Sequence, residues 1–134
     1  MNSLNGTITN LQKSGAIVLA DVDVNGYSFS SILIDSGEHD SWLKTGNNVS
    51  VVFKETEVSL AIGLSGKISM RNRLPCKVVS VNRGELLSKV EMQFNGFVIT
   101  SVITTRSVDS LGIAPGHEAE ALIKANEVFL GAPM

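Results

Sequence analysis

The chain has 134 residues, a formal net charge of −2, a hydrophobic fraction of 43% and an aromatic content of 5%. This composition is typical of a folded globular protein and excludes a disordered one, and no apolar run approaches the roughly 18 residues that cross a bilayer. The acidic balance and the few scattered aromatic residues argue against direct nucleic-acid binding, which needs a basic face or a stacking platform.

The first residues and the cysteine content bear on the cellular compartment. Residues 1–6 lack the basic start and the apolar stretch of a signal peptide. Cys76 has no second cysteine in the chain to pair with, which is compatible with a reducing environment. We therefore expect a cytoplasmic protein without a membrane partner.

The first half of the chain predicts five strands and one short helix. From Ala16 to Val24 apolar and partly polar residues alternate, which is the period of a half-buried strand. Asn25-Gly26 follows, and this dipeptide favours a type I′ hairpin because both turn positions need positive φ. The predicted strands cover residues 4–11, 16–24, 27–34, 48–53 and 58–62, and a helix over residues 35–43 ends before Gly46.

The second half repeats this order, because residues 2–62 and 72–132 align without a gap at an offset of 70. The identical pairs include Asn2 and Asn72, Asn25-Gly26 and Asn95-Gly96, Ser31 and Ser101, Lys54 and Lys124, and Glu57-Val58 and Glu127-Val128. Strands are predicted over residues 74–81, 86–94, 97–104, 118–123 and 128–131, with a short helix around residues 108–111. We call residues 1–63 the first repeat and residues 64–134 the second repeat, and we expect each to be one domain.

Two sets of five short antiparallel strands predict an all-β fold with short helical inserts. Each set suits a partly open Greek-key barrel of the OB type, because a barrel encloses a small core better than a flat sheet does. Repeats of roughly 60–65 residues lie near the lower size at which a core sustains itself. We therefore expect two tandem OB-like barrels that pack together or onto another chain.

The candidate binding residues precede the first strand of the second repeat. In an extended segment Ser69 and Arg71 project to one face, while Met70 and Asn72 project to the other. A hydroxyl and a guanidinium on one face suit a tetrahedral oxyanion, whose oxygens only accept hydrogen bonds. The alternative is a solvated edge strand whose charges discourage aggregation.

Lys124 adds a second cation to this candidate site. It follows the apolar run 121–123, at a strand end where backbone N–H groups become free to meet a ligand. Arg71 and Lys124 together match the charge of a dianion, and Thr104 offers a further hydroxyl. Lys54 holds the equivalent position in the first repeat, so the alternative role of both lysines is to cover a strand end or to pair with a nearby glutamate.

Residues suited to catalysis or metal binding are sparse. His39 and His117 do not correspond in the two repeats, and neither has a second histidine or a cysteine at ligand spacing. Asp21, Asp23 and Asp35 fit turns and strand faces better than an acid–base pair. The sequence also lacks a glycine-rich phosphate loop and a nucleophile elbow. We expect neither an enzyme nor a metal held directly by side chains.

Several runs in the second repeat occur together in a specific combination. They are Ile68-Ser69-Met70-Arg71-Asn72-Arg73-Leu74, Lys77-Val78-Val79, Asn95-Gly96, Ile103-Thr104, Leu111-Gly112, Pro115-Gly116 and Ala121-Leu122-Ile123-Lys124-Ala125. This combination resembles the Mop or TOBE family of molybdate-binding domains. The first repeat resembles a second, more diverged copy. The pair resembles the tandem domains of small cytoplasmic molybdate-binding proteins and of molybdate-responsive transcription regulators.

The resemblance implies an OB-like barrel for each repeat. It also implies a homo-oligomer, either a dimer or a trimer. A molybdate or tungstate oxyanion would bind where its domains or subunits meet. The implied site residues are Ser69 and Arg71, the main chain around Met70 and Asn72, Thr104, Lys124 and the backbone of Ala125. The family commonly has Ala where Met70 stands. The implied role is intracellular storage, buffering or sensing of molybdenum.

The first repeat departs from the family pattern. It has only Met1-Asn2 where the second repeat has its donors, Ile34 where the second repeat has Thr104, and Glu55 where it has Ala125. A carboxylate beside a dianion is unfavourable, so we expect this repeat to supply scaffold and at most one wall of a site. Two alternatives stay open, a ligand-sensing oligomerisation module of a regulator or transport ATPase and, more weakly, an oligonucleotide-binding OB fold.

Overall fold

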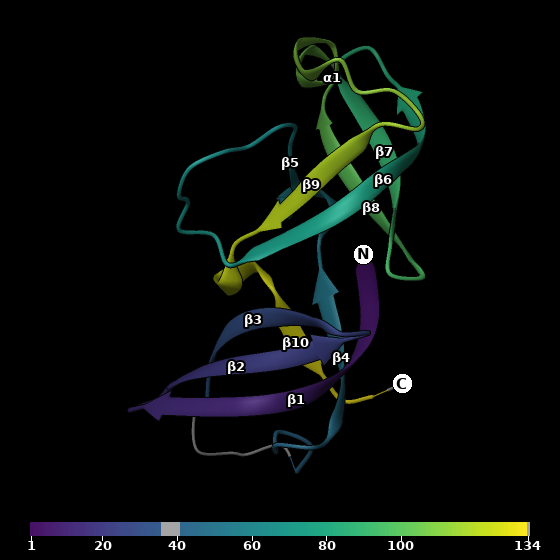
Figure 1. The fold of residues 1–134 in the computed structure, drawn as a ribbon. Coiled ribbons are helices and arrows are strands. Elements are labelled where there is room, and N and C mark those ends of the chain that lie inside the picture. The colour runs from purple at the N-terminus through teal and green to yellow at the C-terminus, as the bar shows by residue number, and fades with distance from the viewer. Residues whose placement is uncertain (36–40, 134) are drawn as a thin grey trace.

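The computed structural model describes residues 1–35 and 41–133. They form two five-stranded antiparallel sheets, each curled into a half-barrel, and they contain no helix long and apolar enough to cross a membrane (Figure 1). One sheet has the order β10-β4-β1-β2-β3 and the other β5-β9-β6-β7-β8. The all-β prediction with two five-stranded units is therefore confirmed.

The elements follow one another in the order that the repeat predicts. The strands are β1 (Asn2–Ser14), β2 (Ile17–Val24), β3 (Tyr27–Ile34), β4 (Asn48–Phe53), β5 (Ser59–Ala61), β6 (Asn72–Arg83), β7 (Leu87–Phe94), β8 (Phe97–Thr104), β9 (Glu118–Ile123) and β10 (Phe129–Gly131). The predicted helix of the second repeat is α1 (Thr105–Leu111). The predicted helix of the first repeat overlaps residues 36–40, which lie outside the described residues. The sequence did not indicate two 3-10 turns, η1 (Glu55–Glu57) and η2 (Ala125–Glu127).

The two predicted hairpin turns have the expected backbone. Asn25 has φ 49° and Gly26 φ 87°, and Asn95 and Gly96 have φ 45° and 87°. Positive φ at both central positions defines the type I′ turn, whose twist matches that of the flanking strands. Asn and Gly adopt this region at low cost, so the two dipeptides fix the β2–β3 and β7–β8 hairpins.

The sheets exchange their last strands. β5 belongs to the first repeat but pairs with β9, and β10 belongs to the second repeat but pairs with β4. In Figure 1 the yellow β10 accordingly lies across the lower sheet and the teal β5 beside the upper one. The predicted domain boundary between residues 63 and 64 therefore separates the two sequence repeats but not the two sheets, because each sheet contains strands from both repeats.

The two half-barrels share one apolar core. Along β2, Val18, Ala20, Val22 and Val24 are all fully buried, as the alternation of the sequence predicts. Rings from the two repeats meet in this core, since the ring centroids of Tyr27 and Phe94 lie 5.3 Å apart in an edge-on arrangement. Two repeats that are each too small for a large core therefore bury their apolar faces against each other.

Hydrogen bonds between the repeats occur in pairs related by the 70-residue offset. The Asn72 side chain pairs with the backbone of Ser30 at 2.7 and 2.9 Å, and Asn2 pairs with the backbone of Thr100 at 2.8 Å in both bonds. The hydroxyls of Ser31 and Ser101 donate to the carbonyls of Val128 and Val58 at 2.5 and 2.6 Å. Many residues that are identical in the two repeats thus lie at contacts between the repeats, because an approximate twofold relation gives both copies the same partner.

Candidate functional site

One cavity, of about 620 Å³, brings together most of the predicted binding residues. One side of it is formed by the loop before β6 and by the turn after β9. The other side is the outer face of β2 and β3 in the first repeat. The lining residues are Ser69, Met70 and Arg71 from the loop, Lys124, Ala125 and Asn126 from the turn, and Leu19, Asp21, Ser30 and Ile32 from the sheet.

The loop that carries Ser69 and Arg71 is not a regular strand. β6 begins only at Asn72, and the chain bends at Ser69. Ser69, Met70 and Arg71 all line the cavity, and the bend at Ser69 means that they do not form the continuous extended segment that the expected alternation requires. Period two requires continuous extended backbone, and the bend interrupts it.

Lys124 stands at the start of the η2 turn. Its backbone is extended, with φ −67° and ψ 142°, and no side chain caps the turn. Within the turn, the N–H groups of Glu127 and Val128 donate to the carbonyls of Lys124 and Ala125. The first N–H groups of such a turn have no partner inside it, so those of Ala125 and Asn126 are at the open end of the turn.

The lining of the cavity contains two cations, Arg71 and Lys124, and one acidic side chain, Asp21. Among the described residues, neither Arg71 nor Lys124 forms an ion pair, whereas the neighbouring Arg73 holds Glu120 through two bonds of 2.9 and 3.0 Å. The Arg73 guanidinium lowers the pKa of Glu120 through these bonds. Arg71 and Lys124 can therefore direct their charge at a ligand.

Two predicted site residues do not line this cavity. Asn72 is fully buried, and its side-chain amide forms hydrogen bonds with the backbone N–H and carbonyl of Ser30. Thr104 lies at the other end of the second repeat, where it lines a separate cavity of about 840 Å³ and caps α1 by accepting a hydrogen bond from the Ser107 N–H at 3.1 Å. Asn72 therefore joins the repeats beside the cavity, and Thr104 does not reach the cavity within one chain.

Sequence reasoning expected the first repeat to supply at most one wall of a site, but it did not name the residues of that wall. Leu19 and Asp21 alternate with the buried residues of β2, and Ser30 and Ile32 do the same along β3. The alternation shows that these side chains point away from the core, but it does not show which segment covers them. Their place opposite Arg71 depends on the packing of the two repeats.

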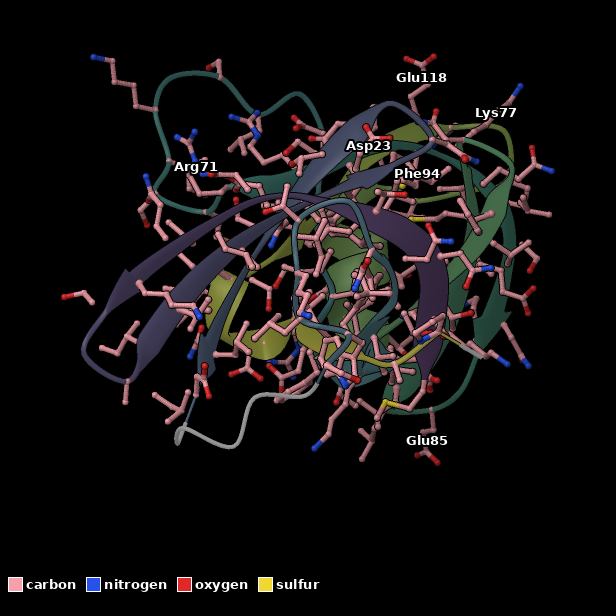
Figure 2. The ribbon with its side chains drawn as sticks, turned by 90° about the horizontal axis from the view of Figure 1, so that it is seen from below. Asp23, Arg71, Lys77, Glu85, Phe94 and Glu118 are labelled. Carbon is pink, nitrogen blue, oxygen red and sulfur yellow. The ribbon has the colours of Figure 1, made fainter. Side chains whose placement is uncertain are left out.

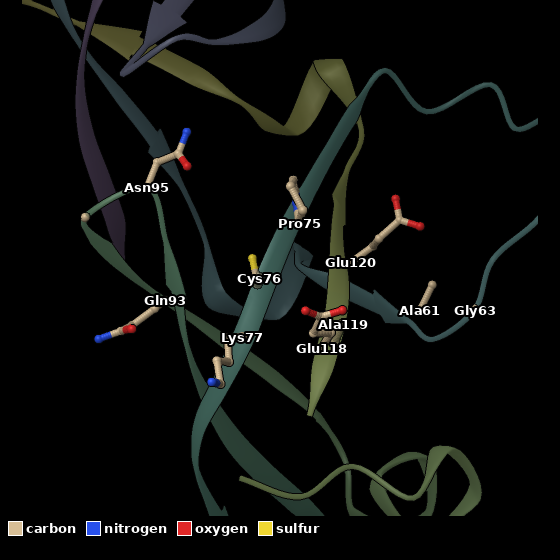
Figure 3. Close-up of a pocket in the computed structure, with 11 residues that line it drawn as sticks. Ala61, Gly63, Pro75, Cys76, Lys77, Gln93, Asn95, Glu118, Ala119 and Glu120 are labelled. Atoms are coloured by element: carbon tan, nitrogen blue, oxygen red, sulfur yellow. The ribbon is translucent and has the colours of Figure 1, made fainter. Parts of the chain in front are cut away.

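A second cavity, of about 540 Å³, lies between β6, β9 and the Asn95 turn (Figure 3). Lys77 and Glu118 are register partners on these strands, and Glu120 is held by Arg73. Burial raises the pKa of the Cys76 thiol to about 11, so this cysteine is protonated at neutral pH. Figure 2 shows Arg71 far from Lys77 and Glu118. This cavity lacks an excess of cations and suits a dianion less well.

The first repeat has a counterpart of the candidate site. Lys54, Glu55 and Thr56, which correspond to the lining residues Lys124, Ala125 and Asn126, line a cavity of about 320 Å³ together with Met1. The Glu55 carboxylate accepts a hydrogen bond from the Met1 ammonium group, and that bond and the charge of Lys89 lower its pKa. An ionised carboxylate therefore occupies the counterpart cavity.

Comparison with known proteins agrees with these features. Residues 68–130 match the TOBE domain family. Over 64 residues the chain is 39% identical to molybdenum-pterin-binding protein 1 of Clostridium pasteurianum, an alignment that covers 47% of this chain and 94% of that protein. The chain belongs to the Mop family of TOBE-domain proteins.

Two longer relatives show how far this Mop-family likeness extends. Molybdenum-pterin-binding protein MopA of Rhodobacter capsulatus is 34% identical over 137 residues, covering 98% of this chain and 51% of MopA. The chain thus spans about half the length of that relative. The crystal structure of the cytoplasmic molybdate-binding protein ModG with molybdate bound is 29% identical, with a TM-score of 0.92, and the match covers 98% of this chain and 96% of ModG. The tandem fold is therefore shared with a solved protein over nearly its whole length.

Proposed function

We propose that this Mop-family chain binds a tetrahedral oxyanion, molybdate or tungstate, and stores, buffers or senses it without catalysing a reaction. The observation that carries the proposal is the cavity that Ser69, Arg71, Lys124 and the open end of the η2 turn line together, in which neither cation forms an ion pair with a described residue. The molybdenum-related names of the relatives, and the molybdate bound to ModG, support this ligand class.

The chemistry of the cavity fits such an anion. Oxyanion oxygens only accept hydrogen bonds, and a guanidinium, an ammonium group, a hydroxyl and backbone N–H groups all donate them. Two positive charges balance a dianion, which limits the cost of removing it from water. Leu19, Ile32 and Met70 supply apolar surface around these donors, and low polarity strengthens each charged hydrogen bond.

Replacing Arg71 by alanine tests the assignment. We expect the affinity for sodium molybdate, measured by titration calorimetry, to fall by about 10- to 100-fold, because hydrogen bonds to charged groups contribute about 1.5–3 kcal/mol. The circular dichroism spectrum should not change, since Arg71 has no ion pair among the described residues. Arg73→Ala is the matched control, because Arg73 pairs with Glu120 outside the cavity. Wild-type affinity in Arg71→Ala would refute the site.

We further propose that the protein works as a homo-oligomer, a dimer or a trimer, in which a second copy completes the site. Thr104 supports this arrangement, because it lines a cavity at a different edge of the same chain, beside Leu86 and Leu87, which are 79% and 58% exposed. An apolar edge of this kind is suited to a protein contact. A neighbouring copy docked there would add the Thr104 hydroxyl to the donors of this chain.

Light scattering with and without molybdate tests the assembly. A constant oligomer favours storage or buffering, and a ligand-driven change in mass favours a sensing module. A monomer under both conditions would contradict the shared site. The cytoplasmic location and the division into domains at residue 63 stay predictions.

A further inference from the structure

A carboxylate lies in the candidate anion cavity. Asp21, on β2 of the first repeat, lines the same cavity as Arg71 and Lys124. Among the described residues its side chain has one hydrogen-bond partner, the Ser30 hydroxyl, with Oγ to Oδ1 at 3.3 Å, and it forms no ion pair with either cation. The cavity therefore holds one negative charge that no described cation neutralises by contact.

This carboxylate has a defined position relative to the anion donors. The backbone N–H and carbonyl of Ser30 are both held by the Asn72 side chain, and Asn72 directly follows Arg71. On the other side, the Thr9 hydroxyl donates to the Asp21 carbonyl at 3.2 Å and fixes β2 against β1. The donor loop and the Asp21 wall are thus tied together through the part-buried bonds between Asn72 and Ser30.

In the second repeat, the acidic side chain at the position equivalent to Asp21 has a lysine beside it. Glu91 corresponds to Asp21, and Lys89, two residues earlier on β7, lies 3.9 Å from its carboxylate. The position of Lys89 is taken by Leu19 in the first repeat, so Asp21 has no cation beside it on its own strand. The charged groups that share its cavity are Arg71 and Lys124.

We propose that Asp21 limits the affinity of the site for dianions, an inference that rests on the proposed function. Its charge leaves the cavity with one net positive charge instead of two, and it repels a doubly charged oxyanion. The carboxylate also accepts a hydrogen bond from the Ser30 hydroxyl, which therefore cannot donate that bond to the ligand. A weakened dianion site releases its ligand readily, as a buffer must.

Asp21→Asn is the test, because the amide has the shape of the carboxylate without its charge. Titration with sodium molybdate at low salt should give an affinity about three- to 30-fold above wild type, and stopped-flow displacement should show slower release. The difference should shrink as sodium chloride rises from 0.1 to 1 M, where the Debye length falls from about 10 Å to about 3 Å. Asp21→Ser, which also removes the charge, should show the same trend. Glu91→Gln is the control and should bind as wild type.

Each result separates this role from the proposed function. If wild type binds molybdate and Asp21→Asn binds equally or more weakly, the Asp21 role is overturned and the proposed function stands. A tighter variant whose advantage does not change with salt also overturns it, because a change in packing would then account for the gain. If only the variants bind, the Asp21 role is supported and the wild-type function is overturned. If no variant binds, both are overturned.

Discussion

The two repeats build nearly the same set of strands but carry different chemistry at equivalent places. At their mutual contact both keep an asparagine, a serine and an Asn-Gly turn, and each makes the same bonds to the other repeat. At the cavities, Lys124 is followed by Ala125, whereas Lys54 is followed by Glu55. Folding needs the contact residues of both repeats, because the sheets exchange strands. The proposed anion site takes its donors from only one repeat.

The sharpest way to separate folding from binding is to compare Asn72→Ala with Asn2→Ala. Each removes two hydrogen bonds to backbone groups of the other repeat and leaves those groups without partners, so each should lower the free energy of unfolding by about 2–4 kcal/mol in urea. Only Asn72→Ala should also weaken molybdate binding, because Asn72 positions Ser30 and the donor loop. Equal loss of binding in both variants would contradict the unequal use of the repeats.

The equivalent lysines give the next contrast. Lys124→Ala removes one of the two cations of the cavity, and we expect the molybdate affinity to fall about tenfold, measured by calorimetry. Lys54→Ala changes the counterpart cavity, where Glu55 is ionised, and should leave the affinity unchanged. A loss of the same size in Lys54→Ala would place an anion in the first repeat as well.

Two serine substitutions compare a buried hydroxyl that bonds to the other repeat with a buried hydroxyl that has no partner among the described residues. Ser101→Ala deletes a buried hydrogen bond to the Val58 carbonyl and should cost about 1–2 kcal/mol of unfolding free energy. Ser50 is 4% exposed, and its hydroxyl has no partner among the described residues, so Ser50→Ala should be neutral or stabilise by up to about 1 kcal/mol. Thermal and urea unfolding of the two variants measure the difference. Destabilisation by Ser50→Ala would mean that its hydroxyl has a partner after all.

The smallest expected effect is the pH dependence that one ion pair of the second repeat, Arg73 with Glu120, contributes. The bonds from Arg73 lower the pKa of Glu120 below its ordinary value of 4.5, so the stability from this pair is complete above that pH and is lost as the pH falls through the lower folded-state pKa. Glu120→Gln should remove this acid-dependent part of the thermal midpoint. Ser50, which does not ionise, stands at the equivalent place in the first repeat, so the first repeat has no matching ion pair. An acid dependence of the same size in Glu120→Gln and in wild type would assign it to other groups, such as Glu55 and Asp109, whose pKa values are also lowered.

Much of the fold could be predicted because the signals are local. The Asn-Gly turns need positive φ, which the sequence reports directly, and the β2 alternation reports the face that is buried. The donors of the second repeat could be recognised for the same reason, since Ser69 and Arg71 are close in sequence. The prediction of a continuous extended segment before β6 was wrong, because the bend at Ser69 is not visible in a short apolar and polar pattern.

Contacts between distant segments could not be predicted. Thr104 was assigned to the site, yet within one chain it lies at another edge, and its hydroxyl caps α1. Asp21 and Ser30 were assigned no site role, yet they form the wall opposite Arg71. A strand-face residue looks the same in sequence whether solvent, a ligand or another repeat covers it.

The duplication, the order and faces of the strands, the hairpin turns and the unequal donors follow from the sequence, because each depends on residues within one strand or turn, or on a comparison at fixed offset. Tertiary structure alone decided that β5 and β10 change sheets and that the first repeat supplies half of the cavity. The physical reason is that backbone hydrogen bonding is the same for any partner strand. Which partner a strand takes is set by how the two small cores pack together.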